Sequence, residues 1–146
     1  MILYTIGFAK KSAKQFFELI RNNDIDILLD IRLNNRSQLA GFTKCDDIAY
    51  FLPNICQCSY KYCPEYAPTK DILDDFKNKK IAWGEYSEKY TSLMESRNNY
   101  HAFVDEYAKY SNVCLLCSEP AHENCHRRLL AEMIARKNSD IGIIHL

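Results

Sequence analysis

The segment from Cys117 to Arg128 gathers more reactive side chains than any other stretch of the chain. Its thiols, imidazoles, carboxylate and guanidiniums come from Cys117, Cys125, His122, His126, Glu119, Arg127 and Arg128. An apolar run, Val113 to Cys117, precedes this segment, and a helical pattern, Arg128 to Lys137, follows it. Open α/β folds place ligands and chemistry at such strand-to-helix junctions.

The start of the helix in this segment is typical of an anion site. Asn124 suits the N-cap position, which would put Cys125, His126 and Arg127 in the first turn. A helix N-terminus offers unpaired N–H groups and the positive end of the helix dipole, so it attracts anions. A cation at Arg127 opposes the dipole, and an anionic ligand would explain it. Arg128 is interpreted as a surface residue paired with Glu132.

Several of these side chains are candidates for catalysis. A thiol at a helix start has a depressed pKa, so Cys125 could be a nucleophile, a redox thiol or a metal ligand. The alternative is an inert, buried cysteine. His126 could act as a general base or ligand, or orient a neighbour. Glu119 follows the strand, where it could exchange protons or hold Arg127 in place.

A zinc site is a further interpretation of the cluster. Cys117, His122, Cys125 and His126 are ligand types that zinc prefers. However, adjacent residues such as Cys125 and His126 rarely face one tetrahedral centre. Cys114 lies three residues before Cys117, so strand alternation puts it on the opposite face, in the core. We therefore expect no metal and no cofactor.

A second group of polar residues follows an earlier apolar run. Asp30 and Arg32 share one face of a strand end, and Arg36 and Ser37 follow in a polar loop. Either Asp30 and Arg32 form a local ion pair and Arg36 is solvated, or the arginines bind an anion while Asp30 orients one of them or acts as a base. Carboxyl ends of parallel strands meet at one edge of a sheet. This predicts a site built from three strand ends: Thr5 and Gly7, Asp30 and Arg32, Cys117 and Glu119.

The order of the elements predicts an α/β fold, in which strands alternate with helices around a mostly parallel sheet. We expect a single three-layer α/β/α domain over residues 1–146. Ser12 and Gln15 resemble a capping box, Asn22 and Asn23 end that helix, and Thr69 caps another. The predicted strands are Ile2–Ile6, Ile25–Ile31, Ile55–Tyr60, Val113–Cys117 and Ile141–His145. The other predicted helices are Asp46–Leu52, Thr69–Lys77, Glu85–Glu95 and Tyr100–Tyr110.

Composition narrows the class of protein. The 146 residues are 47% apolar, which is enough for one core, and Lys+Arg and Asp+Glu both number 19. Because the numbers of positive and negative residues are equal, the composition argues against a protein that coats nucleic acid non-specifically. No run approaches the roughly 20 apolar residues of a membrane span, and no signal peptide is recognised. The odd count of seven cysteines is typical of reduced thiols, which favours a cytoplasmic location. Four tyrosines at helical spacing are assigned to packing: Tyr86, Tyr90, Tyr100 and Tyr107.

The motifs resemble those of the domain of unknown function 488 family. The resemblance rests on Thr5-Ile-Gly7, on Leu29-Asp30-Ile-Arg32 with Arg36-Ser37 and Phe42, and on Leu116-Cys117-Ser-Glu119-Pro with Cys125-His126-Arg127. It implies a compact three-layer α/β domain. It also implies that these residues belong to the site: Asp30, Arg32, Arg36, Ser37, Cys117, Glu119, Cys125, His126 and Arg127. Phe8 stands where the family often has histidine, and Asn35 where proline is common.

These patterns lead to three hypotheses. The first is a strand-end pocket for a phosphate-bearing small molecule or nucleic-acid end, in an enzyme that processes nucleotides or nucleic acids. Arg32, Arg36 and Arg127 would hold the phosphate there. The second is a thiol-redox or metal-binding module centred on Cys117 and Cys125. The third is a non-catalytic domain that binds a ligand or partner protein.

Overall fold

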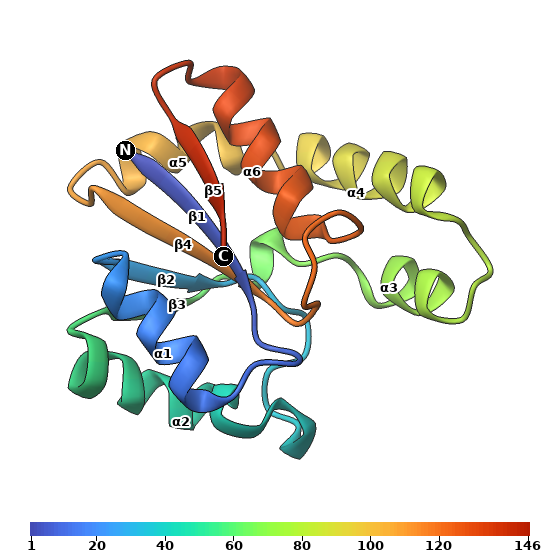
Figure 1. The fold of residues 1–146 in the computed structure, drawn as a ribbon. Coiled ribbons are helices and arrows are strands. Elements are labelled where there is room, and N and C mark those ends of the chain that lie inside the picture. Colours follow the sequence, from blue (N-terminus) through green and yellow to red (C-terminus); the bar gives the residue numbers. More distant parts are fainter.

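A five-stranded, entirely parallel sheet forms the middle layer of the computed structural model, which describes residues 1–146 (Figure 1). The strand order across the sheet is β3-β2-β4-β1-β5. The strands are β1 (Ile2–Gly7), β2 (Ile27–Asp30), β3 (Ser59–Tyr62), β4 (Asn112–Cys117) and β5 (Gly142–His145).

Helices cover both faces of this sheet (Figure 1). One face carries α1 (Ala13–Asn22) and α2 (Cys45–Phe51); the other carries α4 (Trp83–Arg97), α5 (Phe103–Glu106) and α6 (His126–Lys137), with α3 (Lys70–Lys77) packed on α4. Short 3₁₀ or π segments span Gln38–Thr43, Leu52–Cys56, Pro64–Tyr66 and Tyr100–Ala102. The predicted three-layer α/β fold is confirmed. No helix has the length and apolar composition that a bilayer crossing requires.

Strand alternation divides the core into two parts. Leu29 and Leu115 pack with the helices of the α4 and α6 face, whereas Leu28 and Cys114 pack with α1 and α2. Cys114 is therefore a core residue on the face opposite Cys117, as its spacing predicted. Cys117, the last residue of β4, therefore lies on the face of the sheet that α6 covers.

Local capping signals predicted both ends of α1 and the start of α3. Ser12 and Gln15 form the expected reciprocal capping box, and α1 ends at Asn22 with Asn23 as its C-cap. Thr69 accepts a hydrogen bond from the Ile72 amide and begins α3. These side chains satisfy amide groups that the first helical turn leaves free.

Two element predictions were wrong. The expected strand Ile55–Tyr60 begins only at Ser59, because the chain after α2 continues as a π-type turn over Leu52–Cys56. Pro53 lacks an N–H, which interrupts the α-helical bonding without stopping the turn. The expected helix Tyr100–Tyr110 is reduced to a 3₁₀ turn and the four residues of α5.

The topology opens a crevice between β2 and β4. The two strands are neighbours, but the chain leaves β2 toward α2 on one face and leaves β4 toward α6 on the other. Such a divergence is the switch point where open parallel sheets bind ligands. The two predicted strand-end motifs therefore lie on its opposite sides.

Candidate functional site

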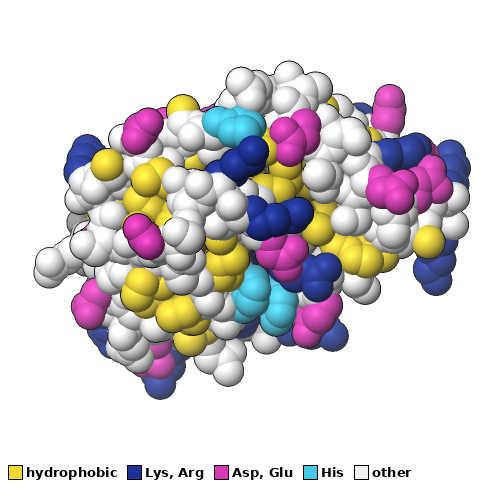
Figure 2. Space-filling model, turned by 90° about the horizontal axis from the view of Figure 1, so that it is seen from above, with side chains coloured by type: hydrophobic (Ala, Val, Ile, Leu, Met, Phe, Trp, Pro, Cys, Tyr) yellow, Lys and Arg dark blue, Asp and Glu magenta, His cyan; other side chains and the backbone are white.

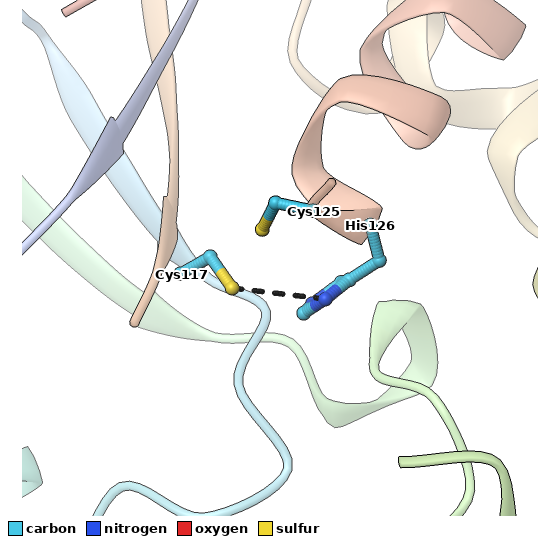
Figure 3. A group of neighbouring side chains, drawn as sticks. All are labelled: Cys117, Cys125 and His126. Atoms are coloured by element: carbon cyan, nitrogen blue, oxygen red, sulfur yellow. Dashed lines mark hydrogen bonds between the residues drawn. The ribbon is translucent and has the colours of Figure 1, made fainter. Parts of the chain in front are cut away.

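Three metal-type donor side chains converge where β4 meets α6 (Figure 3). Cys117 ends β4, Cys125 is the N-cap of α6, and His126 is its first residue. Their donor atoms all lie within 4.8 Å of one another. The Cys117 sulfur lies 3.6 Å from His126 Nδ1. All three side chains are buried, so this group is shielded from bulk water.

The helix start explains how adjacent residues share one point, contrary to our expectation. The N-cap is Cys125 rather than Asn124, with an extended backbone at φ −136° and ψ 139°. The chain becomes helical at His126, and this change of backbone conformation turns both side chains toward Cys117. The inference that adjacency keeps Cys125 and His126 apart was therefore wrong.

The backbone of β2's exit loop orients the His126 ring. Nε2 donates a hydrogen bond to the Ile31 carbonyl at 3.0 Å, because a carbonyl can only accept. Nδ1 is therefore the nitrogen that faces Cys117. The ring also packs near Tyr90, with ring centroids 5.4 Å apart. A carbonyl acceptor of this kind fixes which nitrogen is free for a proton or a ligand.

The thiolate character falls on Cys117 and not, as expected, on Cys125. A hydrogen bond from the Cys125 thiol, with the charges of His126 and Arg127, outweighs burial and lowers the pKa of Cys117. Burial and the neighbouring Cys117 raise the pKa of Cys125. Burial lowers the pKa of His126, but Cys117 and the Ile31 carbonyl outweigh it and give a net upward shift. A thiolate can serve as a nucleophile or as a metal ligand.

A cavity of about 320 Å³ lies over these three residues. The loops that follow β2 and β4 form two of its sides, and Leu73, Phe76 and Tyr86 form an apolar wall. Tyr86 is only 2% exposed, and its hydroxyl, which makes no hydrogen bond within the protein, keeps some accessible surface. The carboxylate-bearing residue Glu119 also lines the cavity and is exposed.

A second hollow, of about 550 Å³, adjoins the first. Lys77, Leu33, Asn34 and Ser118 line both hollows, so they mark the passage between them. Arg36 and Ser37 line only the second. Lys77 has no carboxylate within ion-pair distance, whereas Arg36 Nη1 lies 3.6 Å from Asp46 in an exposed pair. On the face seen from above, Figure 2 shows side chains of both charges interspersed rather than a field of one sign.

The β2 end forms a closed polar network. Arg32 donates to both carboxylate oxygens of Asp30 at 2.8 Å, and to the hydroxyl and carbonyl of Thr43. Tyr60 and Asn35 also donate to Asp30, at 2.7 and 3.1 Å. Asp30 is 0% exposed and Arg32 2% exposed. The ion-pair interpretation is thus confirmed, and Asn35 ties its loop down in the place where proline is common.

Arg127 is completely buried and stabilises the loop after β4. Its Nη1 donates to the Glu119 carbonyl at 2.6 Å and its Nη2 to the Pro120 carbonyl at 3.4 Å, while Nε has no partner. The loop passes so close to Gly7 that a Cβ there would lie 1.6 Å from the Glu119 oxygen. Gly7 is therefore required by this close approach, and Glu119 engages Arg127 through its backbone rather than its carboxylate.

The predicted site residues thus separate into three groups. Arg32, Cys117, Glu119, Cys125 and His126 line the cavity, and Arg36 and Ser37 line the adjoining hollow. Thr5, Gly7, Asp30 and Arg127 line neither; the Thr5 hydroxyl instead lies 2.7 Å from His145 Nδ1. Sequence reasoning missed Lys77 and assigned Tyr86 to packing alone. No local signal pointed to Lys77, because a lysine in the last turn of a helix is ordinary and Asp74 lies three residues before it.

The fold and the site define a doubly covered parallel α/β domain with a cysteine–histidine cluster at its strand ends. A family model described as "Domain of unknown function DUF488" matches residues 12–134. The chain therefore belongs to the DUF488 family, as its motifs predicted. Neither the curated proteins nor the solved structures contain a match to the chain.

Proposed function

We propose that this protein is an enzyme that binds a phosphate-bearing ligand, a nucleotide or a nucleic-acid end, in the strand-end cavity. The observation that carries the proposal is the junction of the two hollows at Lys77. The inner volume, about 320 Å³, falls at the lower end of the range for small-ligand sites. The organic part of the ligand would enter this inner cavity, and the phosphate would remain at Lys77 and Arg36.

The distribution of free donors supports this orientation. At the cavity floor, the two nitrogens of His126 already interact with Cys117 and Ile31. Lys77 has no ion pair, and the exposed pair of Arg36 with Asp46 contributes little, so a phosphate can replace it at small cost. Phosphate is therefore better satisfied at the passage than at the floor.

The remaining lining groups would act on the organic part. The apolar wall of Phe76 and Tyr86 suits a flat ring, and the free Tyr86 hydroxyl can bond to its polar edge. Glu119 is the carboxylate that lines the cavity, and it would exchange protons with the ligand. Cys117, Cys125 and His126 supply the reactive groups beneath.

Calorimetric titration of the full chain with AMP, and separately with adenosine, tests the proposal. AMP is expected to bind at least about tenfold more tightly than adenosine, a difference of about 1.4 kcal/mol. Lys77→Gln should remove most of that difference, because it deletes the cation at the passage. Equal affinities of the wild-type protein for AMP and adenosine, or no binding of either, would contradict the proposal.

Lys80→Gln is the matched control. Lys80 lies three residues further on, lines neither hollow and has its Nζ 3.9 Å from Asp75. Lys80→Gln removes the same charge from the same surface as Lys77→Gln. The Lys80→Gln protein should bind AMP as tightly as the wild type. A loss of affinity as large as that of Lys77→Gln would mean that the effect comes from the net charge of the surface and not from a contact at Lys77.

A further inference from the structure

We propose that Cys117, Cys125 and His126 bind one zinc ion whose fourth coordination position opens into the strand-end cavity. Zinc favours thiolate and imidazole ligands, and two cysteines with one histidine form a recognised catalytic donor set. On binding, Cys125 releases its thiol proton and the Cys117–His126 pair releases the proton that it holds, both to solvent, so that two thiolates and a neutral imidazole, through Nδ1, bind the ion. The zinc ion would lie at the cavity floor, so this inference goes beyond the proposed binding of a phosphate-bearing ligand above it.

The spacing of the donors fits one tetrahedral centre. Zinc–sulfur and zinc–nitrogen bonds of about 2.3 and 2.0–2.1 Å at a tetrahedral angle separate the two donors by about 3.5–3.6 Å. The Cys117 sulfur lies 3.6 Å from His126 Nδ1. The Cys125 sulfur lies within 4.8 Å of both, so a small inward rotation of its side chain completes the triangle.

The surroundings of His126 are those of a metal-bound imidazole. Its Nε2–H donates to the Ile31 carbonyl at 3.0 Å, which leaves Nδ1 directed at the two sulfurs. A hydrogen bond from the nitrogen that does not bind the metal orients the imidazole ring and makes the other nitrogen more basic. Cys117, Cys125 and His126 are 4%, 2% and 5% exposed, so the three ligand residues are shielded from bulk water.

The donor count favours an open rather than a structural site. Structural zinc is held by four protein ligands, whereas catalytic zinc has three and a water or substrate. The group here has three members, and all three line the cavity. The fourth position would therefore face the space in which Glu119 and Tyr86 also lie.

Cobalt(II) titration of the metal-stripped full chain, kept reduced with a phosphine, tests the proposal. One cobalt per chain is expected, with the sulfur-to-cobalt charge-transfer absorption and the strong visible bands of a tetrahedral thiolate site. Zinc should displace the cobalt stoichiometrically. Added azide should alter the visible bands, because it can enter the open position; unchanged bands would contradict an open site.

Cys125→Ser should weaken cobalt binding at least about tenfold and reduce the charge-transfer absorption. Cys114→Ala is the matched control, since Cys114 lies on the same strand as Cys117 but in the opposite core. It should retain both the stoichiometry and the spectrum. Equal losses in the two variants would overturn the assignment of the ligands.

X-ray absorption at the zinc edge of the wild-type protein keeps the test independent of how the variants fold. Two sulfurs and one imidazole nitrogen are expected in the first shell. Absence of stoichiometric zinc binding, or a shell of nitrogen and oxygen alone, would overturn the proposal. Lys77→Gln should leave the cobalt spectrum unchanged while it weakens AMP binding, so failure of the metal site and failure of the ligand site are seen separately.

Discussion

The ends of β2 and β4 both carry buried polar side chains, but they differ in how completely those side chains are satisfied. Asp30 accepts hydrogen bonds from Arg32, Asn35 and Tyr60, and Arg32 is further bonded to Thr43. At the β4 end, the three donor atoms face one another beneath a cavity, and the hydroxyl of Tyr86, which lines that cavity, makes no hydrogen bond within the protein.

The difference separates a structural network from a reactive one. A buried group whose bonding capacity is used within the protein stabilises the fold and has little left for a ligand. A buried group with unused capacity costs stability unless a ligand or ion completes it. We therefore assign loop positioning to the β2 end and chemistry to the β4 end.

Asp30→Asn should produce the largest loss of stability. It leaves the buried guanidinium of Arg32 without a counter-charge, and breaking a buried ion pair costs about 3–5 kcal/mol. Urea denaturation of the metal-free protein measures the free energy of unfolding. Asp46→Asn, which removes the exposed partner of Arg36, should cost at most about 0.5 kcal/mol. Similar costs for the two variants would remove the distinction between the buried and exposed pairs.

Gly7→Ala should be the next most damaging. The added methyl would overlap the Glu119 carbonyl, so the loop must shift and its bond with Arg127 must lengthen. Overpacking of this kind costs about 1–3 kcal/mol. Gly84→Ala is the control, because a Cβ there meets no atom within 4 Å. Thermal unfolding should show a clear loss for the first and none for the second; unchanged stability of Gly7→Ala would contradict the close approach.

Two tyrosines in α4 give a smaller and more selective comparison. Tyr90 donates to the Tyr66 carbonyl at 2.7 Å, so Tyr90→Phe leaves that carbonyl unpaired and should cost about 1 kcal/mol. Tyr86→Phe removes a hydroxyl that has no protein partner and lines the cavity, so it should not lower the free energy of unfolding. Calorimetric titration should instead show weaker AMP binding for Tyr86→Phe. The reverse pattern would mean that the Tyr86 hydroxyl supports the fold rather than the ligand.

The smallest expected effect is a pH dependence at His145. Burial and the charges of His122 and Arg127 lower the pKa of His145 in the folded protein. The unfolded chain therefore binds the proton more readily, and stability should fall as pH decreases through the ordinary histidine pKa of about 6.5. Thermal unfolding between about pH 8 and pH 5 should show a shallower decline for His145→Gln. An equal or steeper decline would contradict the direction of the shift.

The sequence predicted the framework better than the site. Alternation placed Cys114 in the core and Asp30 beside Arg32, and capping residues located the starts of α1 and α3. These features depend on neighbours in sequence. The convergence of Cys117, Cys125 and His126 depends instead on which residue is the extended N-cap. Asn124 is the residue type that suits this position, but the helix begins one residue later, with Cys125 as its N-cap.

Long-range contacts set the rest of the site. Arg127 is buried beneath the loop after β4, and this loop can pass there only because Gly7 leaves room for the Glu119 carbonyl. Gly7 and Glu119 lie on different elements. Lys77 reaches the site because α3 packs beside α4, far from either motif in sequence. Neither relation has a local pattern, so the sequence pointed to these strand ends but not to which of their side chains line the cavity.

A crystal structure of the protein with zinc and AMP, measured at the zinc absorption edge, tests the central claim most directly. We expect one anomalous peak bounded by Cys117, Cys125 and His126, with the phosphate beside Lys77 and the Asp30–Arg32 pair intact. No zinc peak at the β4 end, or a phosphate bound by Arg32 after that pair has opened, would contradict the assignment of chemistry to β4 and support to β2.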